Sequence, residues 1–244
     1  MRRNMLLLLV LMGLVLLFQG IGAAVPTDAA AEIPAEEEPW EEEPRKYVAL
    51  TFDDGPKRPT TEKLLDGLKE RGASATFFLI GEQVEENRDL VLRMAREGHQ
   101  IGNHTWSHQR LDNTEPGTAA WEIGKTETAL TELLGTGDYW LRPPYGQVSP
   151  GEEQRIAVPM VKWSVDPRDW ESRDAEKVTR AILENTKPNS IILLHDIYPS
   201  SVDAALRVVD ELQAEGYWFV TVRELLEING VTPQPGTMYR TGTG

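Results

Sequence analysis

From Lys46 onward, short apolar runs alternate with longer amphipathic stretches, and this alternation constrains the fold more than any other feature. The apolar runs predict β-strands at residues 47–52, 75–80, 100–103, 139–142, 160–165, 190–194 and 218–222. The clearest helical stretch between them has apolar residues at i, i+3, i+4 and i+7, namely Val202, Ala205, Leu206, Val209 and Leu212. Strands alternating with helices indicate parallel βαβ units. We therefore expect a single α/β domain, a barrel related to the (β/α)8 architecture but one strand short, with a doubly wound open sheet as the competing topology.

The side chains suited to catalysis stand where these expected strands end. They are Asp53 and Asp54 after the first strand, His104 after the third, Arg142 at the end of the fourth, Asp166 and Asp169 after the fifth and His195 after the sixth. Barrel enzymes build their active sites at the carboxyl ends of the strands. Purely structural residues have no reason to gather at the same end of five strands, so this placement predicts a catalytic face.

Two histidines and one aspartate form a candidate metal site. His104 and His108 are four residues apart, and on a helical turn their imidazoles would face the same way. With Asp54 they supply two nitrogens and one carboxylate, which suits zinc, or another first-row divalent ion such as cobalt, with coordination positions left open. The chain has no cysteine, so thiolate ligands are excluded. We expect His99, at the start of the third strand, to be a structural hydrogen-bonding residue.

The same ligand set also suits a non-haem iron oxygenase, but nothing in the sequence suggests a site for an oxoacid cosubstrate. The Asp-Asp-Gly-Pro segment that begins at Asp53 is also good turn chemistry. A turn alone does not need two carboxylates directly after a buried run, so we expect one of them to bind the metal and its neighbour to face the reacting water.

Five motifs occur in order along the chain. They are TFDDGP at 51–56, HTWSH at 104–108, RPPYG at 142–146, DPRDW at 166–170 and LLHD at 193–196. Together they resemble the polysaccharide deacetylases of carbohydrate esterase family four, which share the NodB-homology domain. The resemblance extends over roughly residues 45–228. Between Gly146 and Trp163 the chain is slightly shorter than is usual for that family. This segment would form one wall of the substrate groove, so the substrate preference remains open.

The resemblance implies a fold, an activity and a set of site residues. The fold is a distorted, TIM-like (β/α)7 barrel, and the activity is removal of N-acetyl groups from sugars of peptidoglycan or a chitin-like oligomer. The implied roles are Asp53 as catalytic base, Asp54, His104 and His108 as metal ligands, Arg142 as partner of Asp53, Tyr145 as backbone donor to an oxyanion, His195 as general acid, Asp169 as its tuning carboxylate and Trp170 as a groove residue.

Two other functions are compatible with the motifs. An O-acetyl esterase acting on a polymer such as xylan would have the same metal site and differ only in groove contacts. A non-catalytic carbohydrate-binding module that retains the metal would not need Asp53 or His195, so their presence argues against it. Trp106, Tyr145 and Trp170 are candidates for stacking on sugar rings.

The flanking segments predict an exported protein. Arg2 and Arg3 precede an apolar run at 5–18 and then small residues, the order of a secretory signal peptide, or of a signal anchor if it is not cleaved. We assign residues 1–24 to this segment, 25–44 to an acidic disordered linker, 45–230 to the deacetylase domain and 231–244 to a C-terminal tail. We expect a secreted or cell-envelope monomer, in contact with the membrane only through an uncleaved anchor. The net charge of −14 argues against nucleic acid as a partner.

Overall fold

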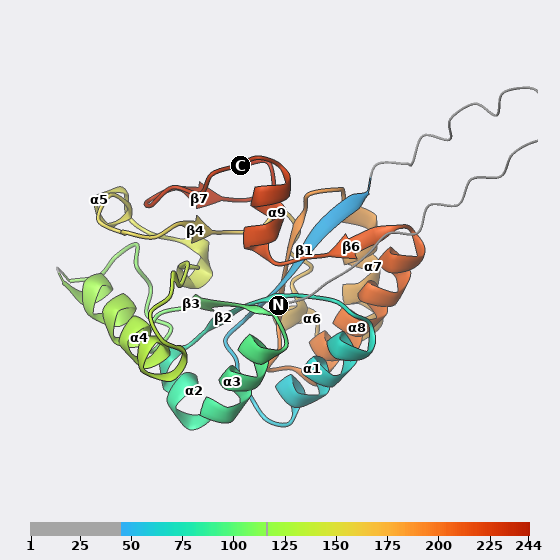
Figure 1. The fold of residues 1–244 in the computed structure, drawn as a ribbon, viewed down its shortest axis with the longest axis horizontal. Helices are drawn as coiled ribbons and strands as arrows, with labels where there is room; N and C mark the ends of the chain where they lie inside the picture. Colours follow the sequence, from blue (N-terminus) through green and yellow to red (C-terminus); the bar gives the residue numbers. More distant parts are fainter. Residues whose placement is uncertain (1–44, 116) are drawn as a thin grey trace, which may run out of the picture. The chain divides into compact units, whose positions relative to one another are not determined.

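The computed structural model describes residues 45–115 and 117–244 (Figure 1). The predicted signal segment at 1–24 and the predicted linker at 25–44 lie outside the described residues. Within the described part, no helix has both the length and the apolar character needed to span a bilayer.

Strand β1 (Lys46–Asp53) is the centre of a parallel sheet. Its neighbours are β2 (Thr76–Leu79) on one side and β5 (Ile191–His195) on the other, and β3 (Gln100–Asn103) continues the sheet beyond β2. Strand β6 (Tyr217–Phe219) pairs with the first residues of β1. The run from Val48 to Asp53 is buried throughout, as expected for a parallel sheet covered on both faces.

Isolated bridges close this sheet into a distorted barrel. Leu141 bridges both Asn103 of β3 and Met160 of β4 (Met160–Val161), and Val165 bridges Ile192 of β5. The predicted strand at 139–142 is therefore a single bridge, and the predicted strand at 160–165 is shortened to β4 followed by one bridge. Proline explains the first difference, because Pro143 and Pro144 have no N–H to extend the ladder.

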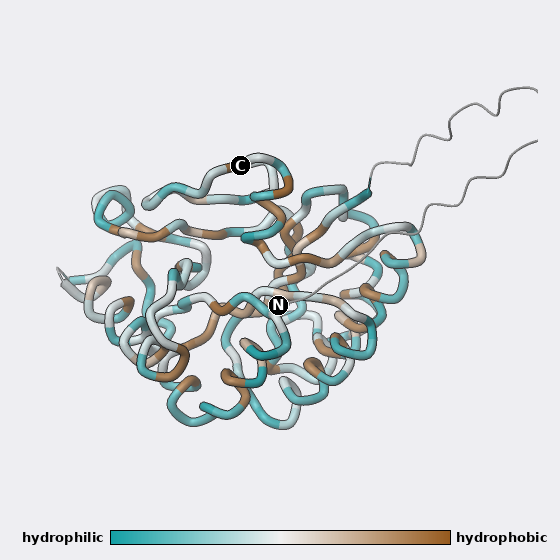
Figure 2. Tube along the Cα trace, in the orientation of Figure 1, coloured by the Kyte–Doolittle hydropathy of each residue, from teal (hydrophilic) through white to brown (hydrophobic). Residues whose placement is uncertain are grey.

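Helices surround the barrel, and the longer ones turn their apolar residues toward the strands (Figures 1 and 2). They are α1 (Thr60–Glu70), α2 (Gly81–Glu86), α3 (Arg88–Arg96), α4 (Thr118–Leu134), α5 (Pro150–Glu153), α6 (Asp169–Ser172), α7 (Ala175–Asn185), α8 (Pro199–Ala214) and α9 (Val222–Ile228), with a 3-10 turn at Pro144–Gly146. In α8 the predicted inward face is confirmed, since Val202, Ala205, Val209 and Leu212 are buried. The short segment after Gly146 has room for the single turn of α5 only.

The C-terminal residues belong to the same compact unit as the barrel. Strand β7 (Met238–Tyr239) pairs in parallel with β4. Gly242 donates a backbone hydrogen bond to the Asn189 carbonyl at 2.8 Å, which ties the end of the chain to the start of β5. The segment at 231–244 is thus part of the packed domain in this structure.

Candidate active site and metal centre

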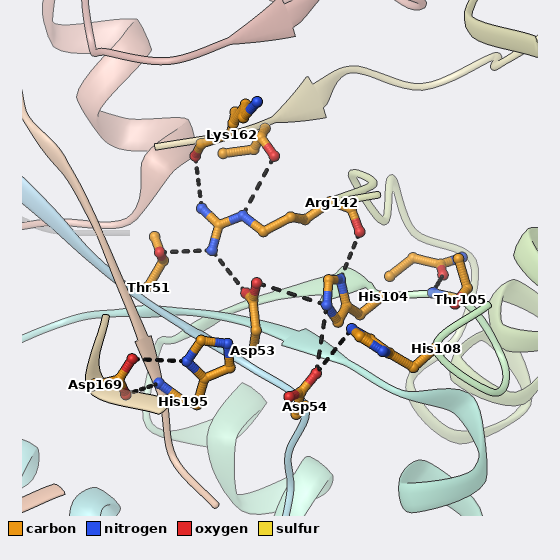
Figure 3. A network of polar contacts seen from close by, with 12 residues as sticks. Thr51, Asp53, Asp54, His104, Thr105, His108, Arg142, Lys162, Asp169 and His195 are labelled. Carbon is orange, nitrogen blue, oxygen red and sulfur yellow. Dashed lines mark hydrogen bonds and ion pairs between the residues drawn. The ribbon is translucent and has the colours of Figure 1, made fainter. Parts of the chain in front are cut away.

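Asp53 is the last residue of β1, and its carboxylate is buried beneath the carboxyl end of the barrel (Figure 3). Its Oδ1 accepts a hydrogen bond from Arg142 Nη1 at 2.7 Å. Its Oδ2 lies 3.7 Å from His104 Nε2. Burial by itself raises the pKa of the Asp53 carboxyl, but the charges of Arg142, His104 and His195 outweigh it and hold this pKa below its usual range. Asp53 is therefore an ionised carboxylate at neutral pH.

The guanidinium of Arg142 is fully buried, and four acceptors surround it (Figure 3). Besides Asp53, it donates to Thr51 Oγ1 at 2.7 Å, to the Lys162 carbonyl at 2.8 Å and to the Val161 carbonyl at 3.3 Å. A buried guanidinium that donates to four acceptors can adopt only one orientation. Arg142 thereby fixes the orientation of the Asp53 carboxylate.

Asp54, His104 and His108 come together beside Asp53. Asp54 Oδ1 lies 3.5 Å from His104 Nε2 and 3.4 Å from His108 Nε2, and one ligand atom from each residue falls within 4.8 Å of the others. The three residues predicted as metal ligands are therefore adjacent. Their local structure differs from the prediction, because residues 104–108 form a loop and not a helical turn. Thr105 (φ 67°) and His108 (φ 60°) are left-handed, which an α-helix does not allow.

The donor atoms of this cluster fit a metal ion. The Arg142 carbonyl, 2.6 Å away, can only accept, so His104 Nδ1 carries the proton and Nε2 presents its lone pair to the cluster. Asp54 Oδ1 is buried and has no hydrogen-bond partner among the described residues. A buried carboxylate oxygen without a partner is costly unless a cation compensates it. Two imidazoles and one carboxylate are a suitable donor set for a first-row divalent ion.

Two residues that sequence reasoning missed hold the ligand loop in place. Asn103 Oδ1 accepts from Thr105 N at 2.9 Å. The buried carboxylate of Glu122 on α4 accepts from Trp106 N, Ser107 N and Ser107 Oγ, each at 2.8 Å. No local pattern in the sequence links Glu122 to a loop 16 residues earlier. Only the packing of α4 reveals this support.

His195 ends β5 on the other side of Asp53, and a carboxylate behind it orients its imidazole (Figure 3). Its Nδ1 donates to Asp169 Oδ1 at 2.9 Å, while Asp169 Oδ2 accepts from His195 N at 2.8 Å and from Ser201 Oγ at 2.6 Å. Burial lowers the pKa of His195, but the hydrogen bond and charge of Asp169 and the charges of Asp53 and Asp54 raise it to about 9. His195 is a cation at neutral pH with Nε2 available to donate. Ser201 was not predicted.

A cavity of about 350 Å³ contains the candidate catalytic and metal-binding side chains. It is lined by Asp53, Asp54, His104, His108, Tyr145, Trp163, Asp166, Trp170, Leu193 and His195. Tyr145 is left-handed (φ 59°), and its ring lies 4.9 Å from that of His108. Tyr145 and Trp170, both named as candidates from the sequence, are exposed at the cavity. Trp106 is buried in the hydrophobic core instead, so the expectation that it could stack on a sugar is wrong.

Two further buried groups have structural roles. His99 Nδ1 accepts from Ala75 N at 3.1 Å, and burial lowers the pKa of His99 to about 4, so it is the neutral structural residue predicted from the sequence. Asp196, which follows His195, accepts a hydrogen bond from Thr61 Oγ1, and that hydroxyl accepts from Lys57 N at 2.8 Å. These two hydrogen bonds connect the loop that contains Asp54 and Lys57 to the end of β5.

The fold and the site define a parallel α/β barrel with a candidate metal centre, an ionised aspartate and a cationic histidine in one cavity at the carboxyl ends of its strands. Comparison with known proteins gives the family. The family model described as polysaccharide deacetylase matches residues 41–155. A peptidoglycan-N-acetylglucosamine deacetylase of Bacillus cereus is 40% identical over 189 residues, which are 74% of this chain and 68% of that protein. The chain belongs to the polysaccharide deacetylase family.

Two further relatives show the range of the family. PgdA, a peptidoglycan-N-acetylglucosamine deacetylase of Listeria monocytogenes, is 39% identical over 180 residues. These are 74% of this chain, but the chain spans only 39% of the length of PgdA. The structure of a family 4 acetyl xylan esterase of Clostridium thermocellum in complex with a cobalt ion matches with a TM-score of 0.76 and 33% identity. The match covers 80% of this chain and 98% of that one, and it confirms the predicted TIM-like barrel.

Proposed function

We propose that this chain is a metal-dependent deacetylase that removes N-acetyl groups from sugars of a polysaccharide, with peptidoglycan or a chitin-like polymer as substrate. The observation that carries the proposal is the arrangement of Asp53 and His195. One cavity holds an ionised carboxylate and a cationic imidazole, together with the cluster of Asp54, His104 and His108. Hydrolysis of an acetamide needs a proton acceptor for the attacking water and a proton donor for the departing amine.

Asp54, His104 and His108 would hold the ion, with zinc favoured by the donor set and cobalt also suitable. When bound, a divalent ion supplies Lewis-acid activation of water and of the acetyl carbonyl. The presence of a cobalt ion in the related Clostridium thermocellum structure supports a first-row divalent ion.

Asp53 Oδ2 would accept the proton of the attacking water, because Oδ1 is engaged by Arg142. Arg142 keeps this carboxylate ionised and immobile, so the acceptor is oriented before the substrate arrives. The backbone N–H of Tyr145, at the left-handed turn beside His108, would donate to the oxygen that becomes negatively charged during attack.

His195 would donate its Nε2 proton to the amine nitrogen as the C–N bond breaks. Asp169 stabilises the imidazolium and directs Nδ1 away from the cavity. An amine leaves poorly without a proton, so this donor matters more for an amide than for an ester. Trp170, exposed at the cavity, would pack against a sugar ring of the polymer.

A second candidate function is O-deacetylation of an acetylated polymer such as xylan, which the match to the acetyl xylan esterase structure favours. The direct test incubates purified, metal-loaded protein with N-acetylglucosamine oligomers, peptidoglycan and acetylated xylan, and measures the acetate released from each. Release from the N-acetylated substrates supports the proposal, and release from xylan alone supports the esterase. Release from none would contradict both, and binding of the same polymers without release would indicate a carbohydrate-binding module.

A further inference from the structure

Two cations lie side by side at the edge of the candidate active site. Strands β4 and β7 are parallel, with Val161 opposite Tyr239. Lys162 N donates to the Tyr239 carbonyl at 2.7 Å, so the register continues to Lys162 and Arg240. Residues in register on parallel strands project to the same face. The two positive charges are therefore neighbours.

The backbone of Lys162 contacts the candidate active site directly. Its carbonyl accepts from the buried Arg142 at 2.8 Å. Its side chain lies against Gly146, where an added Cβ would come within 2.7 Å of Lys162 Cε. Its Nζ is 5.6 Å from the centroid of Trp163, which lines the cavity. The Lys162 side chain thus lies next to the turn that carries Tyr145, although Lys162 itself is not among the residues that line the cavity.

Arg240 faces a second hollow on the far side of the same turn. This hollow has a volume of about 440 Å³ and is lined by Gly146, Gln147 and Arg240 among others. The turn that carries Tyr145 therefore separates the active-site cavity from a hollow with a cation at its edge.

Neither cation has an anionic partner among residues 45–115 and 117–244. Two carboxylates, Asp112 and Glu153, also line the second hollow. Asp112 is engaged by Arg110 at 2.7 Å, and Glu153 forms no ion pair with either cation. Burial, and next the charge of Arg240, lower the pKa of Lys162. Two adjacent cations without an anionic partner in the described part of the chain are a local excess of positive charge, which a bound anion would relieve.

We propose that Lys162 and Arg240 form a subsite for a carboxylate that the polymer carries next to the acetylated sugar. The inference rests on the proposed polysaccharide deacetylase function and narrows its substrate class to acidic polymers. A free lactyl carboxylate, on a muramic acid residue that carries no stem peptide, has this chemistry, and so does a uronic acid substituent on xylan. A neutral chitin-like chain does not.

The test compares oligosaccharides of one length. Two of the substrates are neutral: an N-acetylglucosamine tetramer, and a peptidoglycan tetrasaccharide whose lactyl carboxyls have been converted to methyl amides. Two carry a carboxylate: the same peptidoglycan tetrasaccharide with free lactyl carboxylates, and an acetylated xylan oligomer with a uronic acid substituent. The double variant Lys162→Met/Arg240→Gln is compared with wild type, and Met keeps the packing on Gly146. Lys177→Met/Arg180→Gln on α7 removes the same charge elsewhere and is the matched control.

We expect wild type to prefer a carboxylate-bearing oligomer over its neutral counterparts in kcat/KM for acetate release. The double variant should lose about tenfold on that substrate alone, as expected for loss of a charge-assisted contact. The control should keep the preference, and the preference should weaken with added salt. If kcat/KM falls in the double variant on the muramic oligomer, the subsite binds a lactyl carboxylate. If it falls on the xylan oligomer, the subsite binds a uronic acid.

An equal loss on neutral and anionic oligomers, an equal loss in the control variant, or no wild-type preference would overturn the subsite. Calorimetry of the same oligomers binding to zinc-loaded protein distinguishes failure of the subsite from failure of the proposed deacetylase function. Carboxylate-dependent binding that the double variant lacks would retain the subsite even if no oligomer released acetate. Binding without dependence on the carboxylate would overturn it.

Discussion

The guanidinium of Arg142 and the carboxylate of Asp53 meet at 2.7 Å in the buried centre of the barrel, although 89 residues separate them in the chain. The pair joins the end of β1 to the bridge at Leu141 that helps to close the sheet. Its two members depend on each other, because each would lose its main opposite charge in a buried position without its partner.

Removing the cation should destabilise the fold. Arg142→Met should lower the free energy of unfolding by about 3–5 kcal/mol, the usual cost of leaving one partner of a buried pair. In wild type, the lowered pKa of Asp53 contributes stability above the unfolded pKa, and this is lost as the pH falls through the folded pKa. In the variant, burial should raise the pKa of Asp53, so the decrease in unfolding free energy caused by the substitution should be larger at pH 8 than at pH 5. Urea unfolding at both values checks this, and Arg180→Met, at an exposed pair, should have little effect.

The neighbouring aspartates should separate by role. Asp53→Asn should keep the metal, because Asp54, His104 and His108 remain, and should slow turnover about 10²–10⁴-fold, since an amide cannot accept the proton of water. Asp54→Asn should instead weaken metal binding. Metal content and acetate release are measured on the same preparations. Metal lost from Asp53→Asn and kept in Asp54→Asn would mean that the two assignments are reversed.

The pH profile should report His195. With its pKa at about 9, the donor form persists through neutral pH, and kcat/KM on an N-acetylated oligomer should fall as the pH rises through that value. Asp169→Asn removes the main charge that raises this pKa, so the basic limb should move to lower pH. His195→Ala should slow the amide more than an activated ester. A basic limb that stays in place in Asp169→Asn would exclude His195 as the titrating donor.

Activity should depend on a removable divalent ion. Dialysis against a strong chelator should abolish acetate release, and zinc or cobalt should restore it. Because the ion binds only the folded state, metal addition should also raise the melting temperature. Asp54→Asn should show a smaller rise. Full activity of protein shown by elemental assay to be metal-free would rule out the mechanism.

The mature protein should be found outside the cytoplasmic membrane. Cleavage after Ala24 would place Val25 at the N-terminus of the exported protein, whereas an intact Met1 in a membrane fraction would identify an anchor. N-terminal sequencing of fractionated cells distinguishes these results. Protein confined to the cytosol would contradict both.

Much of the site could be predicted because its signals are local. A carboxylate or imidazole directly after a buried apolar run marks the carboxyl end of a strand, and Asp53, His104 and His195 were all found in this way. The parallel strands then bring these ends together, whatever the details of the loops. The alternation of strands and helices predicted a parallel α/β fold because it depends on residues that are close in the chain, but it left a doubly wound sheet as the competing topology. The resemblance carried by the five motifs is what implied the barrel.

Tertiary packing decided the rest. The left-handed turns that place His108 next to Asp54 depend on Asn103 and on the distant Glu122, and the strand expected at 139–142 is reduced to one bridge beside two prolines. Burial of Trp106 depends likewise on contacts that a local pattern does not contain. By itself the sequence determined that Asp53, the three candidate metal ligands and His195 lie at the same end of the barrel, because the residues next to them in the chain specify where each strand ends. The loop conformations, the orientation of Asp53 by Arg142 and the adjacency of Lys162 and Arg240 were set only by contacts between distant segments, which form when the chain is folded.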